Sequence, residues 1–213
     1  MESFDRHTDY GNNTLRESHL HEEPMANFAA WLVAAEQADI YEPNAFVLGT
    51  VNGKGDPNAR TVLLKAIING KFFFASNYLS QKGLELAENP AASMVFGWYG
   101  MQRQIIVQGT VERASRVDSV NYFESRPHDS QVASWLSAQS QPIESREVLE
   151  NAYNAALADF EGKPVPTPEH WGGYLVTPLR IEFWQGRTSR MHDRIEFKRA
   201  TAGDPWVVTR LQP

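Results

Sequence analysis

The sequence predicts a mainly β fold of the α+β class, a mostly antiparallel barrel decorated by peripheral helices. Three observations predict it: about seven or eight short apolar runs bounded by Gly, Asn or Pro, helical periodicity in only a few segments, and no regular βαβ spacing. The 213 residues, 42% of them hydrophobic, suffice for one buried core. We expect a single domain over residues 25–213, preceded by a mobile arm over residues 1–24.

The first half of this domain is predicted to alternate short strands with tight turns. A helix is expected after Pro24, because apolar residues recur there at i, i+3, i+4 and i+7. Asn52–Gly55 and Asn69-Gly70 are typical of hairpin turns, and Asn89-Pro90 ends a short helix. In order, the expected strands and short helix are Ala45–Val51, Arg60–Ala66, Ile67-Ile68, Phe72–Ser76 and the helix Ser80–Glu88.

The second half is predicted to be helical in its middle and β at its end. Arg126-Pro127 ends one helix, an amphipathic stripe marks another, and three prolines between Gly162 and Pro168 indicate a connector. The expected helices are Val117–Ser125, Ser130–Leu136 and Ser145–Phe160. The expected strands are Ala92–Trp98, Gln104–Arg113, Gly173–Val176, Arg180–Gln185, Arg190–Arg199 and Trp206–Leu211.

Composition excludes several classes of protein. Without cysteine there is no disulfide, thiolate metal site or cysteine nucleophile. The polar N-terminus and the lack of a long apolar run argue against a secretory signal or a membrane span, so we expect a cytoplasmic protein. A net charge of −6 argues against a general nucleic-acid binder but is compatible with a small anionic ligand.

Common nucleotide and hydrolase motifs are missing. The chain has no G-x-G-x-x-G, Walker A, H-E-x-x-H or G-x-S-x-G pattern. His19-Leu20-His21-Glu22-Glu23 contains metal-ligand types, but it lies in the predicted arm, where a site would lack supporting hydrogen bonds. We interpret it as a solvated run and expect no metal.

Three groups of cations remain to be explained. Arg60 and Lys65 bracket an apolar strand and, five residues apart, project to opposite faces, so that each can serve a different ligand. The alternative is an edge strand with solvated ends. Tyr122, Arg126 and Ser130 recur every four residues around a helix boundary, which suits a phosphate. The alternative is a loop with a capping serine and a surface arginine.

The third group is Arg190, His192 and Arg194. In a strand these side chains share one face, where they repel one another unless an anion lies against them. A ladder of salt bridges to a neighbouring strand is the alternative. Trp184-Gln185, Gln104 and Gln139-Ser140 add aromatic and amide groups, which either pack and pair within the protein or bind a planar ring system.

Together these segments resemble pyridoxamine 5′-phosphate oxidases from about residue 10 to residue 213. The motifs that carry the resemblance are Arg60–Lys65, Ser80-Gln81-Lys82, Gln104, Tyr122-Phe123-x-Ser125-Arg126-Pro127-x-Asp129-Ser130-Gln131, Gln139-Ser140, Trp171-Gly172-Gly173, Glu182-Phe183-Trp184-Gln185-Gly186, Arg190-x-His192-Asp193-Arg194 and Arg210-Leu211-x-Pro213. Each motif alone is modest, but their order and spacing along the chain are specific.

The resemblance implies an FMN-binding split β-barrel, homodimeric, with two FMN sites at the subunit interface. It implies that the FMN contacts are Arg60, Thr61, Val62, Leu63, Leu64, Lys65, Ala75, Ser76, Gln81, Lys82, Gln104, Gln139, Ser140, Trp184 and Arg194, with Gln139-Ser140 expected from the partner subunit. The implied substrate contacts are Tyr10, Lys65, Tyr122, Arg126, Ser130, Arg190 and His192. Arg190 and His192 are the implied catalytic residues, over the substrate ring.

The implied activity is that of an oxidoreductase of vitamin B6 metabolism. It converts pyridoxamine and pyridoxine 5′-phosphates to pyridoxal 5′-phosphate, with O2 as acceptor and H2O2 as product. Three alternatives are a related flavin oxidase of phenazine-type biosynthesis, a non-catalytic flavin or vitamer carrier, and a heme-binding split barrel. The sequence departs from the family pattern at His7, Gln81 and His128, where arginine is common. Gln81 predicts weaker FMN retention.

Overall fold

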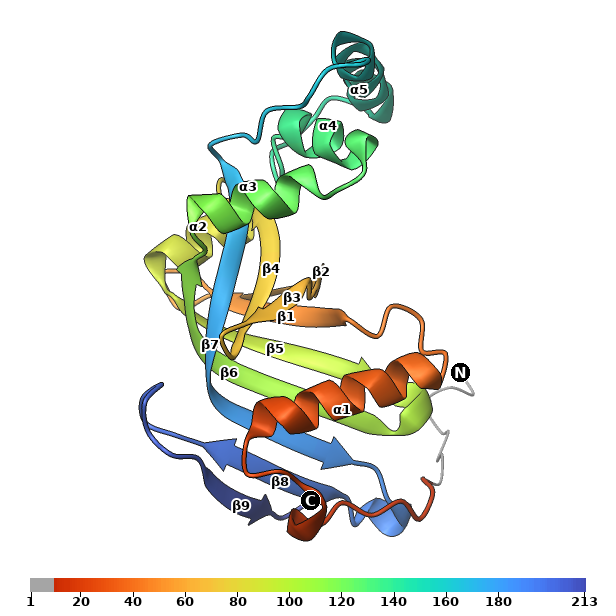
Figure 1. Cartoon of the computed structure of the whole chain (residues 1–213), viewed down its shortest axis with the longest axis vertical. Helices are drawn as coiled ribbons and strands as arrows, with labels where there is room; N and C mark the ends of the chain where they lie inside the picture. Colours follow the sequence, from red (N-terminus) through yellow and green to blue (C-terminus); the bar gives the residue numbers. More distant parts are fainter. Residues whose placement is uncertain (1–9) are drawn as a thin grey trace.

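The computed structural model describes residues 10–213. The centre of this part is one antiparallel sheet of nine strands, curled into a split barrel (Figure 1). The strand order is β2-β1-β5-β6-β7-β4-β3, with β8 beside β7 and β9 beside β8. The strands are β1 Ala45–Val51, β2 Pro57–Leu63, β3 Ala66–Ile68, β4 Lys71–Asn77, β5 Ala91–Trp98, β6 Arg103–Arg113, β7 Trp171–Gln185, β8 Asp193–Lys198 and β9 Val207–Leu211. The predicted fold class is confirmed.

The long strand β7 connects the two ends of the sheet. Its first half pairs with β4 and its second half with β8. Pro178 lies between the halves, where the register against β6 shifts at Gln108/Gly109. Proline lacks an N–H and is accommodated at such a bulge. The prediction of two strands, Gly173–Val176 and Arg180–Gln185, is therefore wrong: they are one bent strand.

Gly109 allows the close approach of β6 and β7 at this bulge. A Cβ at Gly109 would lie 2.0 Å from the backbone oxygen of Thr177, which cannot move without displacing β7. We expect Gly109→Ala to lower the free energy of unfolding by about 1–3 kcal/mol, as overpacking does. Denaturant-induced unfolding measures this change in the free energy of unfolding. Gly203→Ala is the matched control, since its Cβ would meet nothing within 4 Å; equal stability of the two variants would contradict the assignment.

Helix α1, Pro24–Gln37, lies across the concave face of the sheet (Figure 1). The ring of Phe28 meets those of Phe72 and Phe96 edge to face, each at 4.9 Å, and Trp31 packs on Phe183 at 5.2 Å. Aromatic pairs in this geometry add to the free energy of burial. The apolar stripe predicted after Pro24 therefore closes the main core.

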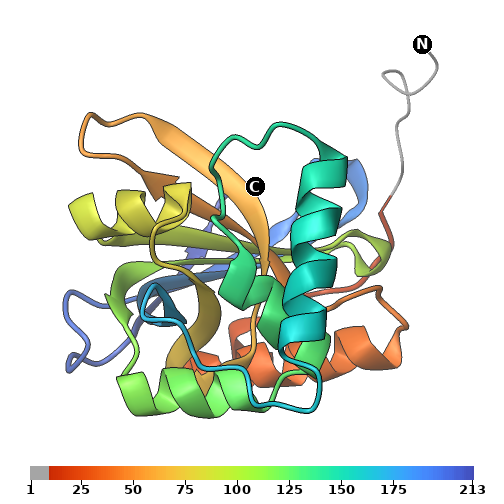
Figure 2. The same cartoon turned by 90° about the horizontal axis from the view of Figure 1, so that it is seen from above.

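The remaining helices are α2 Gln81–Glu88, α3 Arg116–Glu124, α4 His128–Leu136 and α5 Arg146–Asp159. Of these, α2 lies against β1, and α3, α4 and α5 extend beyond one end of the barrel (Figure 1). Figure 2 shows α4 and α5 packed together above the sheet. A second buried cluster lies beneath them, formed by Phe123, Val132, Ala156, Val165 and Trp171. All four helices were predicted to within three residues at each end.

Two predicted strands have wrong bounds. The strand expected over Arg60–Ala66 is β2, which ends at Leu63, because the next two N–H groups turn to different partners. Leu64 N–H donates to Asn44 O, and Lys65 N–H donates to Phe73 O on β4, both at 2.9 Å. Lys65 therefore lies outside the strand, and alternation along it does not place Arg60 and Lys65 on opposite faces.

The strand predicted over Arg190–Arg199 is β8, which begins only at Asp193. Residues 188–190 form a short 3-10 helix, η3, in which Ser189 and Arg190 have φ of 55° and 59°. Positive φ interrupts extended backbone. Arg190, His192 and Arg194 therefore do not share one strand face, and that prediction is wrong.

The segment before α1 contacts the C-terminal strands. Leu15 is buried, and its N–H donates to the carboxylate of Asp193 at 3.0 Å. Arg210 bridges Glu17 and Asp193. The boundary at residue 24 stays a prediction, and His7 lies outside the described residues.

Over residues 10–213, none of the helices has the length and apolar character that crossing a bilayer requires.

Candidate functional site

A cavity of about 520 Å³ opens between the β2–β4 end of the sheet and helices α2, α3 and α4. Its walls contain three cations, Lys65, Lys82 and Arg126, and no carboxylate. The lining residues that the resemblance implied are Thr61, Val62, Leu63, Lys65, Ala75, Ser76, Lys82, Tyr122, Arg126, Ser130 and Gln139. A cavity with this lining is suited to an anionic ligand.

Lys82 marks one end of the cavity. It lies in the first turn of α2, which Ser80 caps by accepting the Gly83 N–H with its hydroxyl. The buried ammonium donates to Ser76 Oγ at 3.2 Å and to Ser80 Oγ at 3.3 Å. Burial, and then the nearby Arg60, hold the pKa of Lys82 below its usual value, while Glu85 opposes the shift. A buried cation with only hydroxyl partners is prepared to bind an anion.

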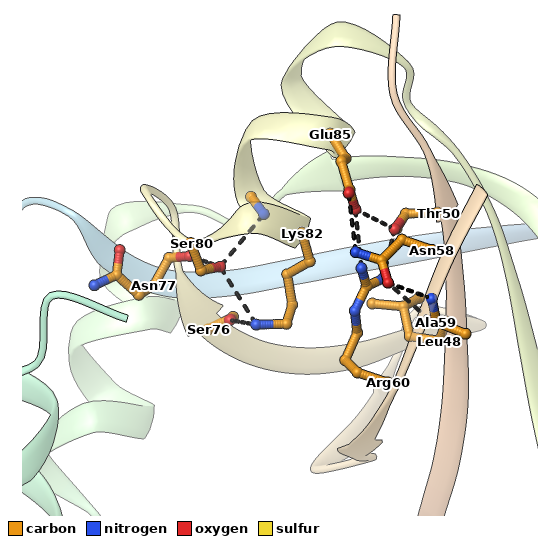
Figure 3. A network of polar contacts seen from close by, with 11 residues as sticks. Leu48, Thr50, Asn58, Ala59, Arg60, Ser76, Asn77, Ser80, Lys82 and Glu85 are labelled. Carbon is orange, nitrogen blue, oxygen red and sulfur yellow. Dashed lines mark hydrogen bonds and ion pairs between the residues drawn. The ribbon is translucent and has the colours of Figure 1, made fainter. Parts of the chain in front are cut away.

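Arg60 stands beside this end, on β2, but it is not among the residues that line the cavity. Its Nη1 donates to Leu48 O at 3.2 Å and to Thr50 Oγ1, and its Nη2 donates to Glu85 Oε2 at 2.9 Å (Figure 3). Burial alone would raise the pKa of Glu85, but hydrogen bonds from Thr50, Asn58 and Arg60 hold it below its usual value. Glu85 therefore stays ionised against Arg60.

Tyr122, Arg126 and Ser130 form the other end of the cavity. Arg126 lies with its guanidinium 4.9 Å from the ring of Trp171, and its Nη1 donates to Ser134 Oγ at 2.8 Å. The ring of Tyr122 stacks on the same Trp171. Burial raises the pKa of Tyr122 and lowers that of Arg126, so the phenol stays a neutral hydrogen-bond donor. The four-residue spacing thus brings these side chains together across the α3–α4 junction.

A second group, the aromatic cluster, consists of Tyr10, Trp184 and His192. Their ring centroids lie 4.7–6.0 Å apart. His192 Nδ1 accepts the backbone N–H of Arg187 at 3.0 Å, so in the neutral ring the proton is on Nε2. Arg190, two residues before His192 in the sequence, is exposed.

The other implied residues lie outside the cavity lining. Arg194 is held by Glu182, at 2.7 Å from Nε and 3.1 Å from Nη2, which agrees with the salt-bridge alternative for that residue. Gln104 is opposite Trp184 in the β6–β7 register. Leu64 is buried, while Gln81 and Ser140 are exposed. Gln139, expected from the partner subunit, lines the cavity of its own chain, where it accepts from Ser76 at 3.3 Å.

The cavity and the aromatic cluster occupy different parts of the chain's fold. No residue of η3 or β8, nor any of residues 10–20, lines the cavity. In Figure 1 helices α3 and α4 stand near one end of the long axis, and β8 and β9 lie at the other. The structure therefore assembles the implied cavity residues into one group and Tyr10, Trp184 and His192 into another. Within one chain the two groups lie apart. Within residues 10–213, no group of three or more acidic or histidine side chains could hold a metal ion.

Sequence reasoning missed several polar residues that surround the cavity. Glu85, Thr50 and Asn58 support Arg60, and Ser134 supports Arg126. Trp171 was noted only within a motif. Glu85 could have been found from the sequence. It falls three residues after Lys82 on a short predicted helix, so these two charged residues share one face of that helix, and the structure buries this face.

Comparisons with known proteins agree with this architecture. The fold is that of the split-barrel proteins. A crystal structure of PhzG from Burkholderia lata 383 with tetrahydrophenazine-1-carboxylic acid matches with a TM-score of 0.89 and 28% identity, over 95% of this chain and 99% of that chain. A pyridoxamine 5′-phosphate oxidase-related, FMN binding protein from Nostoc punctiforme PCC 73102 shares the fold, with a TM-score of 0.72 and 13% identity, over 89% and 97%.

Sequence comparison is more specific. Residues 32–158 match the family model described as pyridoxamine 5′-phosphate oxidase, and residues 171–213 match the pyridoxine 5′-phosphate oxidase C-terminal dimerisation region. A pyridoxine/pyridoxamine 5′-phosphate oxidase of Bacteroides thetaiotaomicron is 45% identical over 96% of both chains. One from Salinispora arenicola is 46% identical over 93% of this chain and 90% of that protein. The chain belongs to the pyridoxamine 5′-phosphate oxidase family.

Proposed function

We propose that this protein is an FMN-dependent oxidase that converts pyridoxamine and pyridoxine 5′-phosphates to pyridoxal 5′-phosphate, reducing O2 to H2O2. The observation that carries the proposal is the cavity with cations at both ends and no carboxylate in its walls. Two phosphates, one of a cofactor and one of a substrate, match two such ends. The cytoplasmic location stays a prediction.

The residues at the α2 end fit FMN. Lys82 and Ser76 offer an ammonium and a hydroxyl, and the strand Thr61–Leu63 lines the adjacent wall. Arg60, outside the lining, would add a guanidinium from β2. When bound, FMN supplies a two-electron acceptor. Lys65, Tyr122, Arg126 and Ser130 would bind the substrate phosphate and thereby orient the carbon that is oxidised.

The aromatic cluster would reach the same site from a second subunit. If Trp184, Arg190 and His192 contact the flavin and substrate, their separation from the cavity in one chain requires a homodimer with two shared sites. The match to a dimerisation region over β7–β9 supports this arrangement. The partner's Arg190 would stabilise charge near the reacting carbon, and the partner's His192 would donate from Nε2.

The related alternative is an oxidase of phenazine-type biosynthesis, which the similarity to PhzG supports. The cluster of Tyr122, Arg126, Ser130 and Lys65 favours a phosphorylated substrate. Flavin absorbance of the purified protein, with pyridoxal phosphate and peroxide followed from both vitamer phosphates, tests the proposal. A yellow protein that oxidises neither vitamer phosphate would refute the B6 assignment and keep the flavoprotein.

The pH dependence of FMN binding should report Lys82. Because burial and Arg60 lower its pKa, Lys82 loses its charge as the pH rises through a value below 10.5. We expect FMN binding to weaken there, while the contribution of Lys82 to apo-protein stability rises, since the unfolded chain binds that proton more tightly. The ratio of the FMN and riboflavin Kd, measured from about pH 7 to 10, isolates the phosphate, which is dianionic throughout. The same pH dependence in Lys82→Met would contradict this assignment.

A further inference from the structure

Glu85 is a buried carboxylate outside the cavity lining, and Arg60 is one of its three hydrogen-bond partners. It is 6% exposed. Its Oε2 accepts from Arg60 Nη2 at 2.9 Å and from the Thr50 hydroxyl at 2.5 Å, and its Oε1 accepts from Asn58 Nδ2 at 3.1 Å (Figure 3). Thr50 in turn accepts from Arg60 Nη1. Glu85 thus connects helix α2 to both β1 and β2.

These contacts determine which donors of Arg60 are left over. A guanidinium has five N–H donors in a rigid plane. Leu48 O and Thr50 take the two on Nη1, and Glu85 takes one on Nη2. Thr50 Oγ1 contacts both Nη1 and Glu85 Oε2, so Glu85 lies at the Nη1–Nη2 edge. The two donors that remain, Nε–H and the second Nη2–H, therefore lie on the other edge and form a fork that can bind two phosphate oxygens.

Lys82 completes the same donor set. Ser76 and Ser80 occupy two of its three ammonium N–H groups, which leaves one. Figure 3 shows Lys82 and Arg60 on adjacent elements, with Glu85 on the α2 side of Arg60. One ammonium N–H and one guanidinium fork are three donors for one phosphate.

We propose that Glu85 is a positioning residue for the cofactor phosphate: it holds Arg60 by Nη2 and Thr50, so that the Nε–Nη2 edge is presented beside Lys82. This inference rests on the proposed FMN binding. Glu85 itself touches no ligand, and as an anion it opposes phosphate binding electrostatically. When the charge of Glu85 is removed, a positioning role therefore predicts weaker FMN binding, whereas simple charge compensation predicts tighter FMN binding.

The test compares Kd values of FMN and riboflavin for the full-length chain freed of flavin, by quenching of flavin fluorescence. Their ratio isolates the phosphate. Glu85→Gln should weaken FMN binding roughly 10-fold, and Glu85→Ala more, in the range of a lost hydrogen bond to a charged group. Riboflavin binding should stay within about twofold, which also reports an intact fold. Glu88→Gln is the matched control: its carboxylate lies on the same helix and accepts from Gly53, not Arg60.

A double-mutant cycle tests whether the effect passes through Arg60. In an Arg60→Met background, Glu85→Gln should weaken FMN binding no further. If Glu85→Gln bound FMN more tightly than the wild type, the positioning role would be wrong and Glu85 would only compensate charge. If the Kd values of FMN and riboflavin rose by the same factor, Glu85 would instead maintain the fold around the site. A wild-type chain that binds FMN no better than riboflavin would refute both the proposed FMN site and this inference. That failure appears before any substitution, so it can be told apart from a failure of the Glu85 role alone.

Discussion

Replacing Arg126 with methionine is expected to raise the KM for pyridoxine 5′-phosphate roughly 10- to 100-fold at saturating FMN. Hydrogen bonds to a charged group contribute about 1.5–3 kcal/mol each, and Arg126 is the cation between Tyr122 and Ser130 in the cavity. Because the loss concerns only the phosphate, kcat/KM for unphosphorylated pyridoxine should change little. Steady-state kinetics with both substrates measure the ratio.

Arg146→Met is the control for this substitution. Arg146 lies on α5, pairs with Glu150 and is largely exposed, so its loss should leave both KM values unchanged. An equal rise in KM for phosphorylated and unphosphorylated substrate in Arg126→Met would contradict the phosphate role. It would indicate instead that the contacts of Arg126 with Trp171 and Ser134 maintain the shape of the cavity.

The second prediction with a large effect is that two inactive variants regain oxidase activity when they are combined in one heterodimer. Lys82→Met should remove the proposed phosphate anchor of the cavity, and Arg190→Met should remove the group that we propose the partner supplies. Each homodimer is expected to be inactive at limiting FMN and substrate. A heterodimer with one chain of each kind has one intact shared site of two, so its activity should be about half that of the wild type.

Purification through two different tags yields this heterodimer, and oxidase activity per dimer measures the result. Wild-type chain paired with either variant is the control, and it should also retain one working site. An inactive heterodimer, with both controls active, would place Lys82 and Arg190 in the same chain's site. That outcome would contradict the inference drawn from their separation in the fold.

The order of elements was predictable because it depends on local patterns. The apolar stripe after Pro24, the hairpin turns and the four helices all come from spacing within about ten residues. The prediction failed where a contact between distant segments decides the backbone. β2 ends at Leu63 because Lys65 turns to β4, and η3 interrupts the strand expected at Arg190 through two residues of positive φ.

The candidate site divides in the same way. Tyr122, Arg126 and Ser130 were predicted to act together, and the structure places them together, because they are neighbours across one helix junction. Glu85, Thr50 and Arg60 were not connected, since 25 to 35 residues separate Glu85 from its partners. Trp184 and His192 were expected beside the flavin contacts of β2, yet in one chain they lie apart from the cavity.

By itself, the sequence determined the fold class, the order of the α-helices found within residues 10–213, the cysteine-free chemistry and, through its motifs, the family. Only the tertiary structure decided which cations face one cavity, which donors of Arg60 and Lys82 remain for a ligand, and that the aromatic cluster lies elsewhere. The physical reason is that periodicity records which face a side chain takes on its own element. Which distant hydrogen-bond partners that side chain meets depends on how strands and helices pack against one another.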